Sequence, residues 1–153
     1  MERVVLWYNV AMKERKPSTF LGRKFMSVLE AWIRRDDRRP LIVKGARQVG
    51  KTACIRQFSE GRFASVVEIN FALQPEFKVI TQDGYSVANI IRNISLVNPS
   101  FRFVAGNTLI FFDEIQDFPE IATAFKSFAE DGRYDVISSG SLLGIQFKRI
   151  ESI

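Results

Sequence analysis

The chain has 153 residues, 46% of them hydrophobic and 25% charged, which is the usual balance of one globular domain with a buried core. Histidine is absent from the sequence, which excludes Ser-His-Asp and Cys-His nucleophile systems and His-ligated zinc in this chain. The one cysteine, Cys54, excludes an intramolecular disulfide and suits a reducing cytoplasm, where we expect the protein to reside.

The net charge of +5 is spread unevenly along the chain. Residues 1–51 hold 13 Lys and Arg against 5 Asp and Glu, whereas the remainder holds 9 against 12. Such an excess can attract nucleic acid, and it can equally be a solvated helix face followed by a linker. Nucleic acid is therefore one candidate partner that composition leaves open.

The N-terminal segment 4–12 is apolar but short, and Lys13 follows it without a small-residue cleavage site. It fits neither a signal peptide nor a membrane span, so we expect no membrane contact. Two interpretations of this segment stay open: a partner-binding strand, or a start with little order. After it, Phe25, Leu29 and Trp32 recur at helical spacing and predict a helix that packs on the domain.

A glycine-rich motif follows a short apolar strand predicted at 40–44. Residues 45–52 fit the pattern G-x-x-x-x-G-K-[ST], and 52–59 predict a helix. Glycines let a backbone wrap phosphates closely, and N–H groups at a helix N-terminus point at the anion. Lys51 is expected to reach the β- and γ-phosphates, and Thr52 to bind Mg²⁺. The expected nucleotide-binding residues are Gly45, Ala46, Arg47, Gln48, Val49, Gly50, Lys51, Thr52 and Ala53.

A second motif closes a strand predicted at 108–112. Four apolar residues precede Asp113 and Glu114, at the end of a buried strand where parallel α/β sheets bind ligands. We expect Asp113 to hold Mg²⁺ opposite Thr52, and Glu114 to orient and deprotonate the attacking water. Taken alone, the pair could equally be a solvated acidic turn, but the loop at 45–52 favours nucleotide binding.

The remaining elements complete an alternating order. Strands are predicted at 65–70 and 134–140, and helices at 86–96 and from Asp117, which can cap a helix that begins with Pro119. The predicted order is β-α-β-α-β-α-β after an initial helix, which is an α/β fold with a parallel sheet. Hydroxyls at 138–141 could touch the attacking water or the γ-phosphate, or could simply end the strand.

Three motifs together resemble a specific family. Residues 45–52, Phe111-Phe112-Asp113-Glu114-Ile115-Gln116 and 140–144 are similar to the bacterial and archaeal AAA-type ATPases whose full chains carry a C-terminal domain of unknown function. The resemblance runs from about residue 23 to residue 144. It implies a P-loop NTPase three-layer sandwich, with Walker A at 45–52 and Walker B at Asp113 and Glu114.

The resemblance further implies catalytic roles and missing parts. Lys51 and Glu114 would be catalytic, and Ser139 or Ser141 would occupy the sensor-1 position, whereas Gln116 and Arg47 match without an assigned role. Relatives continue past this point with a fifth strand, a helical lid and the C-terminal domain. We therefore expect an N-terminal extension (1–22), an AAA-type core (23–147) truncated before strand 5, and a stub (148–153).

In AAA-type sheets the strand order resembles 5-1-4-3-2, so the strand at 40–44 would lie at an unpaired edge. Such an edge is a pairing liability, and we expect either a homo-oligomer or a missing C-terminal half to cover it.

These motifs favour an ATPase that binds ATP with Mg²⁺ and hydrolyses it in the full-length context. Two alternatives remain: a nucleotide- or partner-binding module without turnover, and a DNA-associated helicase-like ATPase, since Asp113-Glu114-Ile115-Gln116 also resembles a helicase motif. A GTPase is disfavoured because the sequence contains no Asn-Lys-x-Asp segment.

Overall fold

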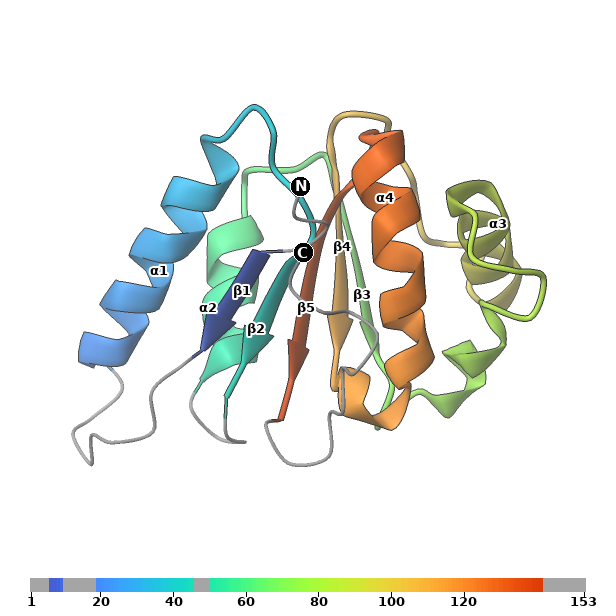
Figure 1. The fold of residues 1–153 in the computed structure, drawn as a ribbon, viewed down its shortest axis with the longest axis horizontal. Helices are drawn as coiled ribbons and strands as arrows, with labels where there is room; N and C mark the ends of the chain where they lie inside the picture. The colour runs from blue at the N-terminus through green and yellow to red at the C-terminus, as the bar shows by residue number, and fades with distance from the viewer. Residues whose placement is uncertain (1–5, 10–18, 46–49, 142–153) are drawn as a thin grey trace.

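In the computed structural model, five parallel strands form one sheet with helices on both faces (Figure 1). The structure describes residues 6–9, 19–45 and 50–141. The strand order is β1-β2-β5-β4-β3. The strands are β1 (Leu6–Asn9), β2 (Leu41–Lys44), β3 (Ser65–Asn70), β4 (Thr108–Asp113) and β5 (Asp135–Gly140). The predicted α/β sandwich with a parallel sheet is confirmed.

Four α-helices form the two outer layers. Figure 1 shows α1 (Thr19–Ile33) and α2 (Lys51–Ser59) on one side of the sheet, and α3 (Val87–Val97) and α4 (Phe125–Asp131) on the other. Two hydrophobic clusters correspond to these two sides. Every residue of β4 is buried, as expected for a central strand with both faces covered.

The cluster under α1 and α2 confirms the helical spacing read from the sequence. Phe25, Leu29 and Trp32 are at most 3% exposed, and they share a cluster with Leu41 and Val43 of β2. Ile42, between these two, joins the cluster on the other face, because successive side chains of a strand point to opposite sides. The strand that leads into the glycine-rich loop is thus held from both faces.

The connection after β4 differs from the predicted helix that begins at Asp117. Two 3₁₀ helices, η2 (Ile115–Asp117) and η3 (Pro119–Ala124), come first, and α4 begins only at Phe125. Asp117 belongs to η2, and the residue that precedes Pro119 is Phe118, whose backbone is not helical (φ −147°, ψ 66°) and whose side chain offers no cap. A further 3₁₀ helix, η1 (Pro75–Val79), follows β3.

The N-terminal strand corrects the expectation of an unpaired edge at 40–44. β1 pairs in parallel with β2 from Leu6 beside Leu41 to Asn9 beside Lys44. The segment is therefore an edge strand of this sheet, which neither interpretation of 4–12 anticipated. α1 runs across the expected boundary between residues 22 and 23, whereas the expected stub (148–153) lies outside the described residues.

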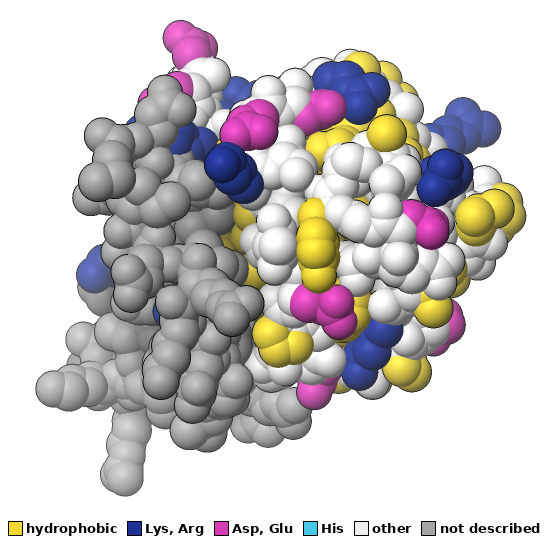
Figure 2. Space-filling model, turned by 45° about the vertical axis from the view of Figure 1, so that its right-hand side comes forward, with side chains coloured by type: hydrophobic (Ala, Val, Ile, Leu, Met, Phe, Trp, Pro, Cys, Tyr) yellow, Lys and Arg dark blue, Asp and Glu magenta, His cyan; other side chains and the backbone are white. Residues whose placement is uncertain are grey.

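Much of the charge in the described part of the chain is paired or dispersed. Arg35 pairs with Asp37, and Arg38 pairs with Asp135, so part of the basic run before β2 is used within the protein. On the face in Figure 2, basic and acidic side chains lie interspersed with scattered hydrophobic ones. None of the helices in the described part of the chain has the length and apolar character of a membrane span.

Candidate functional site

Of the predicted site residues, those that the structure describes lie around the carboxyl ends of β2, β4 and β5. Parallel strands end at the same edge of the sheet, which is where α/β folds bind ligands. There the N–H of Gly45, which follows β2, donates to the carbonyl oxygen of Gly140 at 3.2 Å. The start of the glycine-rich loop is thereby fixed against the end of β5.

The end of the loop leads directly into α2. Gly50 has a left-handed backbone (φ 76°), which glycine adopts without steric cost, and Lys51 is the first helical residue. The first N–H groups of a helix lack partners within the helix and attract anions. The predicted binding residues Ala46, Arg47, Gln48 and Val49 lie outside the described residues, whereas Ala53 lies exposed in the first turn of α2.

Lys51 is buried and bound to backbone oxygens. Its Nζ donates to the carbonyl oxygen of Gly45 at 2.8 Å and to that of Gly140 at 3.0 Å. Burial lowers the pKa of Lys51, while the negative charges of Glu114 and Asp113 act in the opposite direction. The ammonium group thus lies between two backbone carbonyl oxygens and is attracted by the carboxylates of Asp113 and Glu114.

Thr52 and Asp113 form the direct link between the two sequence motifs. The Thr52 hydroxyl donates to Oδ2 of Asp113 at 2.8 Å, and the N–H of Glu114 donates to Oδ1 at 2.9 Å. Asp113 is 3% exposed, and this burial is the main cause that raises its pKa; the hydrogen bond from Thr52 opposes the rise. A buried carboxylate beside a hydroxyl is a favourable place for a divalent cation.

These two oxygens are a partial ligand set. The described residues contain no group of three or more His, Cys, Asp and Glu side chains that could hold a metal ion by themselves. Mg²⁺ ordinarily keeps several waters and is bound by one or two protein ligands together with substrate phosphates. Thr52 and Asp113 fit that mode of binding.

Glu114 has an unusual backbone and a defined partner. Its φ of 55° is the one positive value among the non-glycine residues that the structure describes. Nε2 of Gln116 donates to the Glu114 carboxylate, and the N–H of Ser141 donates to Oε1 of Gln116 at 3.1 Å. Sequence analysis had assigned no role to Gln116, and its position two residues after Glu114 was the signal that could have suggested one.

The serines at the end of β5 lie in different surroundings. Ser138 is fully buried beside Phe112, and its hydroxyl has no hydrogen-bond partner in the described residues. Ser139, the next residue, pairs with Val43 of β2 and therefore lies on the opposite face of the sheet, towards α2. Ser141 contacts Gln116 through its backbone. The sensor role expected of Ser139 or Ser141 stays a prediction.

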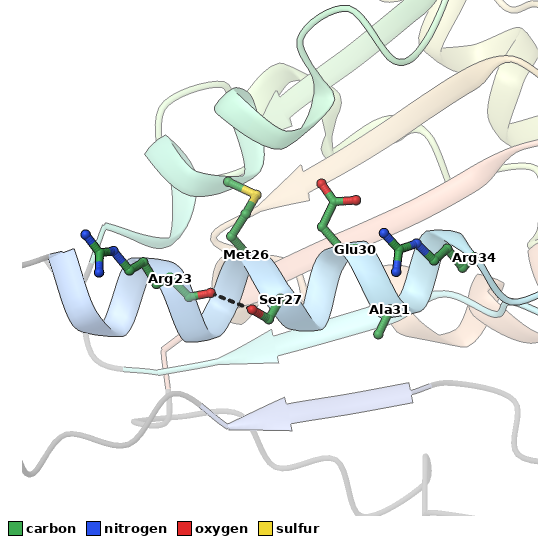
Figure 3. Close-up of a pocket in the computed structure, with 6 residues that line it drawn as sticks. All are labelled: Arg23, Met26, Ser27, Glu30, Ala31 and Arg34. Carbon is green, nitrogen blue, oxygen red and sulfur yellow. Dashed lines mark hydrogen bonds between the residues drawn. The ribbon is translucent and has the colours of Figure 1, made fainter.

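Two other features lie outside this cluster. A hollow of about 570 Å³ on the outer side of α1 is lined by Arg23, Met26, Ser27, Glu30, Ala31 and Arg34 (Figure 3). None of these six residues belongs to the strand-end cluster. Cys54 is half-buried on α2, and burial raises the pKa of its thiol, which favours a packing role over a reactive one.

Comparisons with known proteins concern the family and the fold of the chain. A family model described as an AAA domain matches residues 37–153, which include both motifs. The solved structure of PCH-2 from C. elegans is similar to this chain with a TM-score of 0.51 and 13% sequence identity. That similarity covers 86% of this chain and 40% of the PCH-2 chain, and at this identity it shows the fold alone. No curated protein matches the sequence.

Proposed function

Since the chain belongs to the AAA domain family, we propose that it binds ATP with Mg²⁺ at the carboxyl ends of β2, β4 and β5. The observation that carries the proposal is the 2.8 Å hydrogen bond between Thr52 and Asp113. It joins the first turn of α2 to the end of β4, beside the buried ammonium group of Lys51. A positively charged ammonium group, a hydroxyl and a buried carboxylate thus lie together where a triphosphate would meet the helix N-terminus.

Each side chain has a distinct part in this proposal. Lys51 would exchange the carbonyl oxygens of Gly45 and Gly140 for phosphate oxygens, which are stronger acceptors because they are charged. Thr52 and Asp113 would hold Mg²⁺, which supplies positive charge against the phosphate oxygens. Ser139 lies on the same face of the sheet as Asp113 and would serve as a polar contact at the end of β5.

We further propose hydrolysis of ATP with Glu114 as the general base. Its carboxylate lies next in sequence to Asp113 and is held by Gln116, so it is positioned at the edge of the proposed metal site. A carboxylate so placed can accept a proton from water as the water attacks.

The test is Mg·ATP binding and turnover by the parent chain and by Lys51→Ala and Glu114→Gln. Lys51→Ala should weaken binding by roughly 30-fold or more, the loss expected for a charge-assisted contact of about 2 kcal/mol. Lys126→Ala is the matched control, since Lys126 is exposed on α4 and pairs with Glu130. Equal affinity of the Lys51 variant and the parent would contradict the site.

Glu114→Gln should keep binding and abolish turnover, because an amide keeps the shape of the side chain but cannot accept the proton. Glu76→Gln is the control, as Glu76 lies exposed in η1. Binding without turnover in either protein would contradict hydrolysis by this chain alone and would favour the alternative of a nucleotide-binding module. Failure of the parent chain to bind Mg·ATP would contradict the proposed function as a whole.

A further inference from the structure

One peptide group at the end of β5 is held from both sides. The carbonyl oxygen of Gly140 accepts hydrogen bonds from the Gly45 N–H at 3.2 Å and from Nζ of Lys51 at 3.0 Å. The N–H of the same peptide group belongs to Ser141, and it donates to Oε1 of Gln116 at 3.1 Å. Because a peptide group is planar and stiff, these contacts fix Gln116 relative to the glycine-rich loop.

Gln116 uses both ends of its side-chain amide. A backbone N–H can only donate, so the end that faces Ser141 must be the oxygen and the opposite end must be the NH₂ group. That NH₂ group donates to the carboxylate of Glu114. The hydrogen-bond chemistry therefore determines which way the amide points, and its donor end is aimed at Glu114.

The backbone brings Glu114 to this partner at some cost. Its left-handed conformation (φ 55°, ψ 48°) costs a non-glycine residue roughly 1 kcal/mol and persists where the surroundings impose it. Two features impose this conformation here. The Glu114 N–H donates to Asp113, and the neighbouring Ile115 is 0% exposed in the core. η2, which carries Gln116, is thus anchored to the protein interior.

We propose that Gln116 is a positioning residue that fixes the Glu114 carboxylate against the same peptide group that holds Lys51. The inference rests on the proposed function, since only a hydrolytic site needs Glu114 in a defined place. Gln116 does not touch the reacting atoms; it acts through Glu114. Its contribution should therefore be seen in turnover rather than in nucleotide affinity.

Two substitutions separate positioning of Glu114 from support of β5. Gln116→Glu keeps the size of the side chain and an oxygen for the Ser141 N–H, but it places a carboxylate where the donor to Glu114 was. Gln116→Ala removes both contacts. Gln82→Glu is the matched control, because Gln82 lies exposed in a turn after η1.

Both Gln116 variants should keep most of the Mg·ATP affinity and lose turnover by roughly tenfold or more, as a misplaced catalytic group does. Gln82→Glu should match the parent in both measurements. If Gln116 only supports the end of β5, Gln116→Glu should behave like the parent while Gln116→Ala is impaired. That outcome would overturn the proposal.

A second measurement needs neither nucleotide nor turnover. The urea midpoint of unfolding is compared for Glu114→Ala, Gln116→Ala and the double variant in the ligand-free protein. Because the two side chains contact each other, the double variant should lose less than the sum of the single losses. Additive losses would overturn the proposal even if the chain shows no turnover. Absence of Mg·ATP binding by the parent would contradict only the proposed function.

Discussion

Arg38 is expected to contribute far more to stability than its neighbour Arg35. It lies between α1 and β2, and its guanidinium donates to both carboxylate oxygens of Asp135 at 2.8 and 3.2 Å. It also donates to the carbonyl oxygens of Ile33 and Arg35 at 3.2 and 3.1 Å. Arg38 therefore ties the C-terminal end of α1 to the start of β5, the strand that ends at the site.

The exposure of the two ion pairs determines the expected magnitude. The side chains of Arg38 and Asp135 are 29% and 16% exposed, whereas those of Arg35 and Asp37 are 50% and 65% exposed. A two-pronged pair at the lower exposure should be worth about 1–2 kcal/mol, between the surface and buried limits. Contacts with the end of α1 should add about 0.5–1 kcal/mol. Arg38→Met should then cost roughly 1.5–3 kcal/mol, and Arg35→Met at most about 0.5 kcal/mol.

Thermal and urea unfolding of the two variants and the parent check this reasoning. At about 2–4 °C per kcal/mol for a domain of this size, Arg38→Met should lower the Tm by roughly 3–12 °C. Asp135→Asn and the double variant isolate the ion pair from the contacts with α1. Equal shifts for Arg38→Met and Arg35→Met would refute the argument from exposure.

Two further predictions concern the edge of the sheet and the buried carboxylate. Deletion of residues 1–9 removes β1 and uncovers the backbone edge of β2, so size-exclusion chromatography should show self-association that increases with concentration. Deletion of residues 1–5 keeps β1 and should leave the elution unchanged; equal behaviour of the two deletions would contradict the role of β1. Burial raises the pKa of Asp113, so the carboxyl group binds its proton more tightly in the folded protein than in the unfolded chain. The parent should then lose stability as the pH rises from the ordinary value of 3.8 through the raised pKa, and Asp113→Asn should be the more stable protein at neutral pH. Urea unfolding as a function of pH tests this, and a difference that does not shrink towards acid pH would contradict it.

The sequence determined those elements whose pattern is local. The apolar spacing of Phe25, Leu29 and Trp32 predicted the buried face of α1, because side chains three and four residues apart share one side of a helix. Likewise, the apolar run before Asp113 predicted a strand buried on both faces. The glycine-rich motif that follows β2 predicted the position of Thr52 at the start of α2. Together, the two motifs predicted that Thr52 lies opposite Asp113, and the structure joins them by a hydrogen bond.

Only the tertiary structure decided the contacts that depend on strand order. β1 pairs with β2 and so satisfies N–H and C=O groups that would otherwise be unpaired at the edge of the sheet. No local sequence pattern reveals which segment supplies that strand. The left-handed backbone of Glu114 and the 3₁₀ helices after it also depend on how the segment packs onto the core. Gln116 meets Ser141, 25 residues later in the chain, because β5 lies beside β4. Spacing along a strand or helix is set by covalent geometry, whereas such pairings are set by which hydrogen-bonding groups remain to be satisfied when the sheet closes.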